Sequence, residues 1–173
     1  MRALFLALAA TVCLAGCQSP PVKVLKVDNA HLREPGRVPP ANACGYRLKS
    51  VVDGRAQSDA GGLGLKQLKI DDAIGLVRDT LLEAGMLPAD AQSNGREVTV
   101  VLRQLYLSWN RMTKVPVVVY TVQVPGQEDF LIRAQPATIN WAATDDETYR
   151  SISRALHGAN AQLLDRLAAT CRP

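Results

Sequence analysis

Three β-rich segments in succession, with a helical pattern before and after them, restrict the fold more than any other feature of this sequence. Residues 98–109, 115–124 and 130–141 are rich in β-branched and aromatic residues and are separated by short turn sequences. Strands that follow one another through short turns pair as antiparallel neighbours. We therefore expect three antiparallel strands, the last of which is interrupted at Pro136 and so lies at an edge or carries a bulge.

Two segments have apolar residues at the three- and four-residue spacing of an amphipathic helix. The first covers residues 70–81 and begins with two aspartates, whose negative charge the helix dipole favours there. The second begins at Thr144 or Asp145 as N-cap, with Glu147 as a capping-box partner. The apolar stripe of this second helix would also fit a coiled-coil seam. Few charges flank the stripe, however, so we expect the helix to pack on a sheet. The stripe contains Tyr149, Ile152, Leu156, Ala159, Leu163 and Leu167.

A further strand over residues 46–52 precedes the first helix and completes the set of elements. The order strand, helix, three strands, helix predicts a two-layer α+β fold. We expect a four-stranded, mostly antiparallel sheet with both helices packed on one face, in which the first strand is parallel to the second or separated from it. Residues 44–173 are long enough for one core and are predicted to form a single globular domain.

The N-terminal residues have the pattern of an export signal. Arg2 precedes an apolar run over residues 3–14, which is shorter than the roughly 20 residues that a transmembrane helix needs. A positive start followed by a short apolar run is typical of a secretory signal peptide. We therefore expect residues 1–16 to be a signal peptide that is removed.

The end of the apolar run, Leu14-Ala15-Gly16-Cys17, resembles the lipobox of bacterial lipoproteins. The resemblance implies cleavage before Cys17, a lipid on its thiol, and acylation of the new N-terminus, for example by palmitate. Two or more acyl chains hold a protein stably to a membrane, whereas one holds it marginally. Gln18 is not the aspartate that retains enteric lipoproteins in the inner membrane, so the resemblance implies an outer-membrane anchor that faces the periplasm. An ordinary signal peptide followed by an incidental cysteine is the alternative.

Residues 18–43 contain five prolines, which disfavour helices and central strands. We predict that residues 17–43 comprise the lipidated cysteine and a mostly extended tether, which at full stretch would reach roughly 85 Å. Residues 22–27 alternate weakly and would also fit a short edge strand, but we favour the tether.

Two further cysteines bracket the expected domain. Cys13 leaves with the signal and Cys17 carries the lipid, so Cys44 and Cys171 remain in the mature chain. Exported proteins meet an oxidising compartment, which predicts a Cys44–Cys171 disulfide. Two reduced and unrelated thiols are the alternative.

The composition argues against several classes of function. The formal charge of +4 comes from 20 Lys+Arg and 16 Asp+Glu that are spread along the chain, without the basic stripe of a nucleic-acid-binding protein. Two His and four Cys leave little material for a metal site, and the H-E-x-x-H, CxxC and G-x-S-x-G motifs do not occur. We therefore predict no metal, no cofactor and no nucleic-acid partner.

Two candidate chemical features are weak. Ser153 and His157 share a helical face, but no carboxylate is visibly placed to orient the histidine, and such pairs are usually polar surface residues. We therefore predict that the chain is not an enzyme. The Gly-Gly-Leu-Gly sequence at residues 61–64 lacks the rest of a phosphate-binding loop and is predicted to be a flexible loop.

The most suggestive local feature is Asp53-Gly54-Arg55 at the end of the first expected strand. Asp53 and Arg55 are predicted to form either a local salt bridge that holds the following loop, which we favour, or part of an interaction loop. With the lipobox, the later Leu63-Gly64 and the order of elements, this sequence resembles the YajG-like envelope lipoproteins. In layout the chain is also similar to LptE-like lipopolysaccharide-assembly lipoproteins and to auxiliary lipoproteins of lipid-transport systems.

This resemblance implies a protein without catalytic activity that binds lipid or glycan, or that supports a β-barrel or transporter partner. We accordingly predict a lipid-anchored interaction or accessory module that presents a sheet edge, or the loop over residues 54–69, to another envelope protein. The alternative is an auxiliary lipoprotein that binds or transports a lipid or glycolipid in an apolar cavity between helices and sheet. The aliphatic stripe of the last helix and the low aromatic content, 5% of the residues, motivate this alternative.

Overall fold

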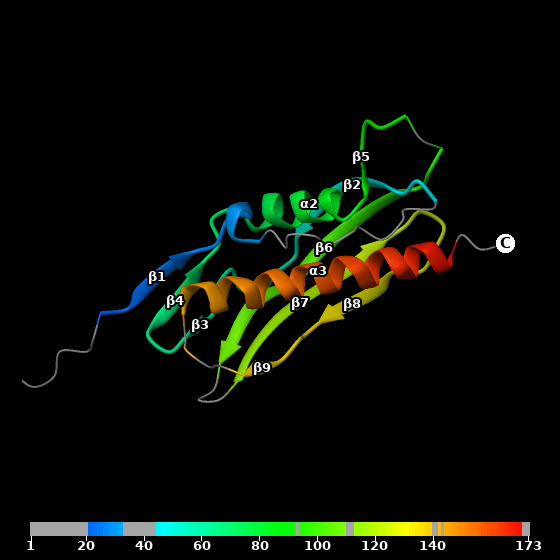
Figure 1. The fold of residues 1–173 in the computed structure, drawn as a ribbon. Helices are drawn as coiled ribbons and strands as arrows, with labels where there is room; N and C mark the ends of the chain where they lie inside the picture. The colour runs from blue at the N-terminus through cyan, green and yellow to red at the C-terminus, as the bar shows by residue number, and fades with distance from the viewer. Residues whose placement is uncertain are drawn as a thin grey trace, which may run out of the picture.

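The computed structural model describes residues 21–32, 44–92, 94–109, 113–139, 142 and 144–170. These residues form a main sheet of six strands, a small sheet of three strands and two α-helices (Figure 1). Along the chain the order is β1, η1, β2, β3, β4, α2, β5, β6, β7, β8, β9 and α3.

The main sheet contains the strands that the sequence predicts, the last of them divided into β8 and β9, together with the short strand β5. Its strand order is β5-β2-β6-β7-β8, and β9 pairs with β7 beside this path. β2 is parallel to β5 and β6, whereas the pairs β6–β7 and β7–β8 are antiparallel. The bounds are β2 (Arg47–Asp53), β5 (Leu87–Pro88), β6 (Glu97–Trp109), β7 (Thr113–Gln123), β8 (Phe130–Ala134) and β9 (Thr138–Ile139).

The small sheet has the order β1-β4-β3. β1 (Lys23–Lys26) runs parallel to β4 (Lys66–Lys69), and β3 (Gly62–Leu63) forms an antiparallel hairpin with β4. A bridge between Gly61 and Leu107 joins this sheet to β6. After β1, the short 3-10 helix η1 (Asn29–His31) contacts both α2 and α3.

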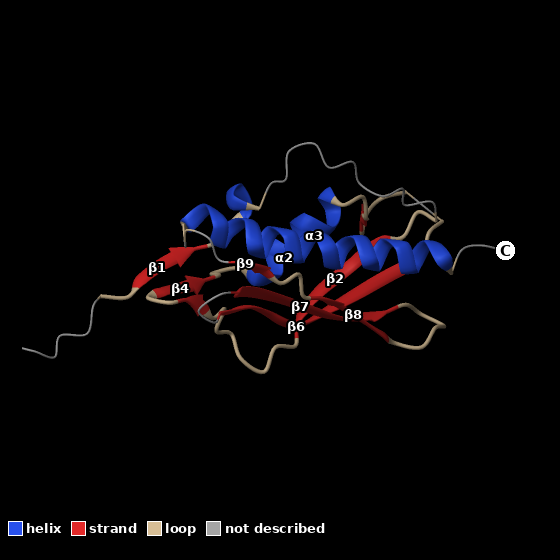
Figure 2. Cartoon of the chain, turned by 60° about the horizontal axis from the view of Figure 1, so that its bottom comes forward, coloured by secondary structure: helices blue, strands red, loops and turns tan. Residues whose placement is uncertain are grey.

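Both α-helices lie on one face of the main sheet (Figure 2). α2 (Ala73–Glu83) packs on β2, and α3 (Asp145–Ala169) packs on β7 and β8. The Asp72 carboxylate caps α2 by accepting a hydrogen bond from the Gly75 N–H, and the Thr144 hydroxyl caps α3 by accepting one from the Glu147 N–H. We call the covered side of the sheet the helix face and the opposite side the outer face.

The core lies between the helix face and the two helices and is mainly aliphatic. Leu81 of α2, Leu102 of β6 and Leu156 of α3 are fully buried there. Tyr120 of β7 is also fully buried, and its hydroxyl donates a hydrogen bond of 3.2 Å to the Asn160 side-chain oxygen on α3. Burial raises the pKa of the Tyr120 phenol, because the charged form would lose its hydration. The core therefore fixes α3 over β7 by apolar packing and one buried hydrogen bond.

The predicted α+β class with both helices on one face is confirmed, but the predicted four-stranded sheet is wrong. Four predicted strands form β2, β6, β7 and β8, and β2 is parallel to β6 as one of the two expected arrangements. The segment 130–141 is divided into β8 and β9 on either side of Pro136, as the interruption at that proline predicts. The additional strands are two to four residues long, and such lengths leave no measurable periodicity in a sequence.

The predicted tether needs a second correction, because residues 23–32 belong to the folded domain. Lys23–Lys26 pair with β4, and Leu25, Val27 and Leu32 are buried in the same core as the rest of the domain. Burial of these apolar side chains attaches this segment to the domain. The rest of the predicted signal and tether, residues 1–20 and 33–43, lies outside the described residues.

Candidate interaction surface

The outer face of the main sheet presents a row of mostly apolar side chains that crosses four strands. Val52 of β2 pairs with Val101 of β6, Val101 pairs with Thr121 of β7, and Thr121 pairs with Leu131 of β8. We call these four residues the apolar row. Directly paired side chains on one face of a sheet lie close enough to touch, so the row is continuous.

The two ends of the apolar row are exposed and its centre is covered. Leu131 is 57% exposed and Val52 is also exposed, whereas Val101 is buried. The Arg103 side chain covers part of the centre, since its Nε donates a hydrogen bond of 3.1 Å to the Thr121 hydroxyl. The row therefore offers apolar contact area beside a guanidinium group, a combination that is common in protein interfaces.

β8 brings Leu131 to an open edge of the sheet. Phe130, Ile132 and Ala134 of this strand point into the core, while Leu131 and Arg133 are exposed on the outer face. β8 is the last strand in the sheet order and pairs with β7, and no other strand of the described residues pairs with it. An uncovered edge offers backbone N–H and C=O groups to an added strand.

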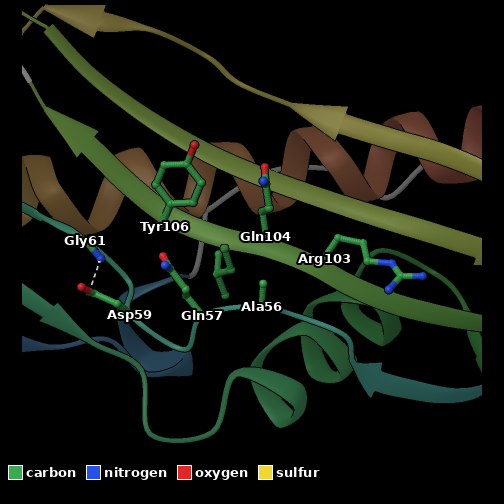
Figure 3. Close-up of a pocket in the computed structure, with 8 residues that line it drawn as sticks. Ala56, Gln57, Asp59, Gly61, Arg103, Gln104 and Tyr106 are labelled. Atoms are coloured by element: carbon green, nitrogen blue, oxygen red, sulfur yellow. Dashed lines mark hydrogen bonds between the residues drawn. The ribbon is translucent and has the colours of Figure 1, made fainter.

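A hollow of about 250 Å³ opens beside β6, where the chain leaves β2 (Figure 3). β2 ends its pairing with a bond of 2.9 Å from the Gly54 N–H to the Leu102 carbonyl, and the chain rejoins β6 through a bond of 2.8 Å from the Leu107 N–H to the Ala60 carbonyl. Between these points the loop bows away from the strand. The hollow between them is lined by Ala56, Gln57, Asp59 and Gly61 of the loop and by Arg103, Gln104, Leu105 and Tyr106 of β6.

Gly61 determines how closely the loop returns to β6. Its φ is +69°, and a Cβ atom at this position would collide with the carbonyl oxygen of Leu107. Its N–H donates a hydrogen bond of 2.7 Å to the Asp59 carboxylate, which is drawn as a dashed line in Figure 3. The predicted flexible loop over residues 61–64 is therefore instead the start of the ordered β3–β4 hairpin, in which glycine permits close backbone approach.

Asp53 and Arg55 form the local salt bridge, the favoured one of the two predicted arrangements. Arg55 Nε and Nη2 donate to the two Asp53 carboxylate oxygens at 2.9 and 2.7 Å, and the Arg55 backbone N–H also donates to this carboxylate at 3.1 Å. The hydrogen bonds from Arg55 lower the pKa of Asp53, and the same pair raises the pKa of Arg55. This pair closes the start of the loop that borders the hollow.

Ser153 and His157 contact each other, but Ser153 is not the surface residue that we expected. Its hydroxyl is buried and donates a hydrogen bond of 2.7 Å to the Leu32 carbonyl, just after η1. His157 Nδ1 lies 2.8 Å from the Ser153 carbonyl oxygen and 3.3 Å from its hydroxyl. The serine proton is therefore engaged in attaching the N-terminal segment to α3. In addition, His31 of η1 stacks on Tyr149 of α3 with 3.9 Å between ring centroids.

A second polar cluster lies where α3 begins. Lys114 of β7 is 3% exposed, and its Nζ is 3.1 Å from Glu147 Oε2. Burial raises the pKa of Glu147, but the hydrogen bonds from Lys114 and from the Ala142 N–H outweigh it and lower that pKa. This ion pair lines a hollow of about 360 Å³ together with Thr138, Ile139, Arg150, Ser151 and Arg154.

The remaining sequence predictions concern residues that the structure leaves undescribed or sites that it does not form. Cys17 and Cys171 lie outside the described residues, so lipidation and the Cys44–Cys171 disulfide stay predictions. In the described part of the chain, no group of three or more His, Cys, Asp and Glu is arranged to hold a metal ion. None of the described helices has both the length and the apolar character required to cross a bilayer.

Sequence reasoning missed the apolar row. Each of its residues lies on a predicted strand, but the row is created by strand register, which connects positions up to 79 residues apart, from Val52 to Leu131. A usable signal was nevertheless present, because Leu131 lies between buried positions in a strictly alternating strand and so had to face the other side.

Comparison with known proteins identifies a shared fold. No protein-family model matches the sequence, and no curated protein matches it. A solved structure of protein XCC0632 from Xanthomonas campestris, assigned to the family model DUF330, matches with a TM-score of 0.52 at 10% identity. The match covers 86% of this chain and 95% of that chain. The chain is therefore similar in fold to this Xanthomonas protein across most of both lengths.

Two weaker structural matches are to proteins named as lipoproteins. Rare lipoprotein B from Shewanella oneidensis matches at a TM-score of 0.31 and 17% identity, over 72% of this chain and 92% of that chain. A minor lipoprotein from Acinetobacter baumannii matches at a TM-score of 0.40 and 11% identity, over 75% of this chain and 98% of that chain. We draw the shared fold from the Xanthomonas structure and no function from these two.

Proposed function

We propose that this protein is a lipid-anchored lipoprotein of the bacterial cell envelope that acts, without catalysis, as an interaction module for another envelope protein. The anchor is supported by the apolar run of the signal and by the lipobox-like Leu14-Ala15-Gly16-Cys17. We place the anchor in the outer membrane, facing the periplasm, on the basis of Gln18.

The apolar row carries the interaction proposal, because it ends in an exposed leucine at an open strand edge. A partner that adds an extended segment beside β8 would pair with backbone groups of this strand and cover Leu131 at the same time. Proteins usually protect such an edge by charge, bulges or a covering element, so an exposed leucine here is better explained by a partner that covers it.

The absence of catalysis is part of the proposal and is supported by the environment of Ser153. A nucleophilic serine gives its proton to a base, whereas this hydroxyl donates to the Leu32 carbonyl inside the fold. The lipid-carrier alternative placed an apolar cavity between the helices and the sheet. The hollows described above instead open beside β6, where the loop leaves β2, and at the start of α3, and charged or polar residues contribute to both linings.

Photocrosslinking in intact cells tests the interaction module. A photoreactive amino acid at position 131 is expected to give one discrete protein adduct, which mass spectrometry identifies as an envelope protein. The matched control is position 65, because Leu65 is 54% exposed but lies in the β3–β4 turn rather than on the outer face. Adducts of equal yield from both positions, or no adduct from position 131, would contradict the proposal.

A further inference from the structure

An exposed apolar cluster lies at the end of the molecule where β1 begins. Val22 is 58% exposed, Leu65 is 54% exposed and Trp109 is 40% exposed. We call these three residues the β1-end cluster. They belong to three separate parts of the chain: the residue before β1, the β3–β4 turn and the end of β6.

Contacts around the β3–β4 turn bring the three residues together. The Lys23 N–H donates a hydrogen bond of 2.8 Å to the Leu65 carbonyl, which places Val22 next to this turn. The Trp109 ring lies over Gly64, since a Cβ atom on Gly64 would be 3.6 Å from Trp109 Cη2. Figure 1 shows the start of β1, the β3–β4 hairpin and the end of β6 at the same end of the molecule, opposite the C-terminus.

The chemistry of this cluster suits the boundary between lipid and water. Tryptophan combines a large apolar ring with one N–H donor, and it is enriched where membranes meet water. Valine and leucine beside it add aliphatic area that would enter the region below the headgroups. Exposed apolar side chains that lie next to one another mark a surface for a partner or a membrane more strongly than any one of them alone.

The position of the proposed lipid anchor indicates that the surface next to the β1-end cluster is the membrane. Five residue steps separate Cys17 from Val22, so the chain between them spans at most about 18 Å when fully extended. Because β1 is part of the fold, this short link replaces the long tether that the sequence predicts. A lipid on Cys17 therefore keeps Val22 within about 18 Å of the bilayer that holds the anchor.

We propose that the β1-end cluster of Val22, Leu65 and Trp109 contacts the bilayer and seats this end of the domain on the membrane surface. The proposal rests on the lipid anchor of the proposed function. It adds a second, non-covalent membrane contact, and it orients the molecule with its C-terminal end directed away from the lipid.

Fluorescence quenching in vesicles tests this contact on the lipidated mature chain. The chain has two tryptophans, so Trp141→Phe leaves Trp109 as the reporter. In phosphatidylcholine vesicles with brominated acyl chains, we expect the emission to fall about twofold relative to unbrominated vesicles, since an interfacial tryptophan lies within reach of the acyl chains. Val22→Glu with Leu65→Glu is expected to abolish this quenching.

Leu131→Glu in the same background is the matched control, because Leu131 is as exposed as Leu65 but lies on the outer face. It is expected to leave the quenching unchanged, and thermal unfolding establishes that each variant is folded. Vesicle sedimentation separates the two proposals. Protein that does not sediment overturns the anchor and the contact that depends on it. Protein that sediments but shows no bromine quenching overturns the contact alone.

Discussion

At the scale of single residues, Lys114 stands out because the fold buries a lysine and pairs it with one carboxylate. Its side chain is almost fully buried, whereas its partner Glu147 keeps some access to water. Removing one partner of a buried ion pair leaves an uncompensated charge, which costs more than the pair itself contributes. The two single substitutions should therefore have unequal effects.

Glu147→Gln is expected to lower the free energy of unfolding at neutral pH, because it leaves the Lys114 ammonium buried without a counter-charge. Lys114→Met should cost less, since water reaches Glu147, and the double variant should recover part of the loss. The pKa of Glu147 in the folded protein lies below its ordinary value of 4.5, so the pair stabilises the fold above that pH. Stability from the pair should fall as the pH drops below this value.

Urea unfolding at several pH values measures these effects. The difference between the parent and Glu147→Gln should be largest near neutral pH and shrink in acid, as the carboxyl takes up a proton. A difference that stays constant from neutral pH into acid would show that the charge of Glu147 is not the stabilising feature.

The chemistry of single residues could be predicted where the partners are close in sequence. The Asp53–Arg55 salt bridge follows from residues two positions apart, and the Ser153–His157 contact follows from helical spacing. The burial of Ser153 could not be predicted in the same way, because the residue that covers it, Leu32, is 121 positions earlier in the chain.

At the scale of elements, length decides what the sequence can predict. β6 and β7 have 13 and 11 residues, and α3 has 25, so each repeats its apolar pattern often enough to be recognised. β3 has two residues and exists because Gly61 and Gly62 allow the backbone to approach β6 and β4. Such an element depends on the backbone that it approaches rather than on a pattern of its own.

Gly61→Ala tests this dependence, and Gly126→Ala is its matched control. Both glycines have positive φ, 69° and 79°, but a Cβ atom would meet the Leu107 backbone at Gly61 and nothing within 4 Å at Gly126. Backbone strain alone should cost about 1 kcal/mol for Gly126→Ala, and the added collision should cost Gly61→Ala at least about 2 kcal/mol more. Unfolding midpoints of the two variants give this comparison, and equal losses would contradict it.

At the scale of the whole molecule, the segment just before β2 meets the end of α3 in space. The Tyr46 and Thr170 hydroxyl groups are 2.8 Å apart, and they lie two residues after Cys44 and one residue before Cys171. This proximity supports the disulfide that the export signal and the cysteine positions predict. A bridge here would close a loop that contains almost all of the domain.

Replacing Cys44 and Cys171 together by serine is expected to lower the free energy of unfolding by about 2–5 kcal/mol, because the unfolded chain regains the freedom that the closed loop removes. Denaturant titration of both proteins measures the loss. Intact mass after alkylation without reductant gives the independent control: the bridge predicts no alkylation at these positions, and alkylation of both thiols would refute it.

The position of β1 has a mechanical consequence for an anchored molecule. A pull on the residues before Lys23 acts along the strand, and the neighbouring β4 runs in the same direction beside it. Tension of this kind loads the hydrogen bonds between the two strands in shear, so they share the force instead of opening one after another. If the lipid holds one end while a bound protein moves the other, this four-residue strand pair is the part of the fold that resists the load first.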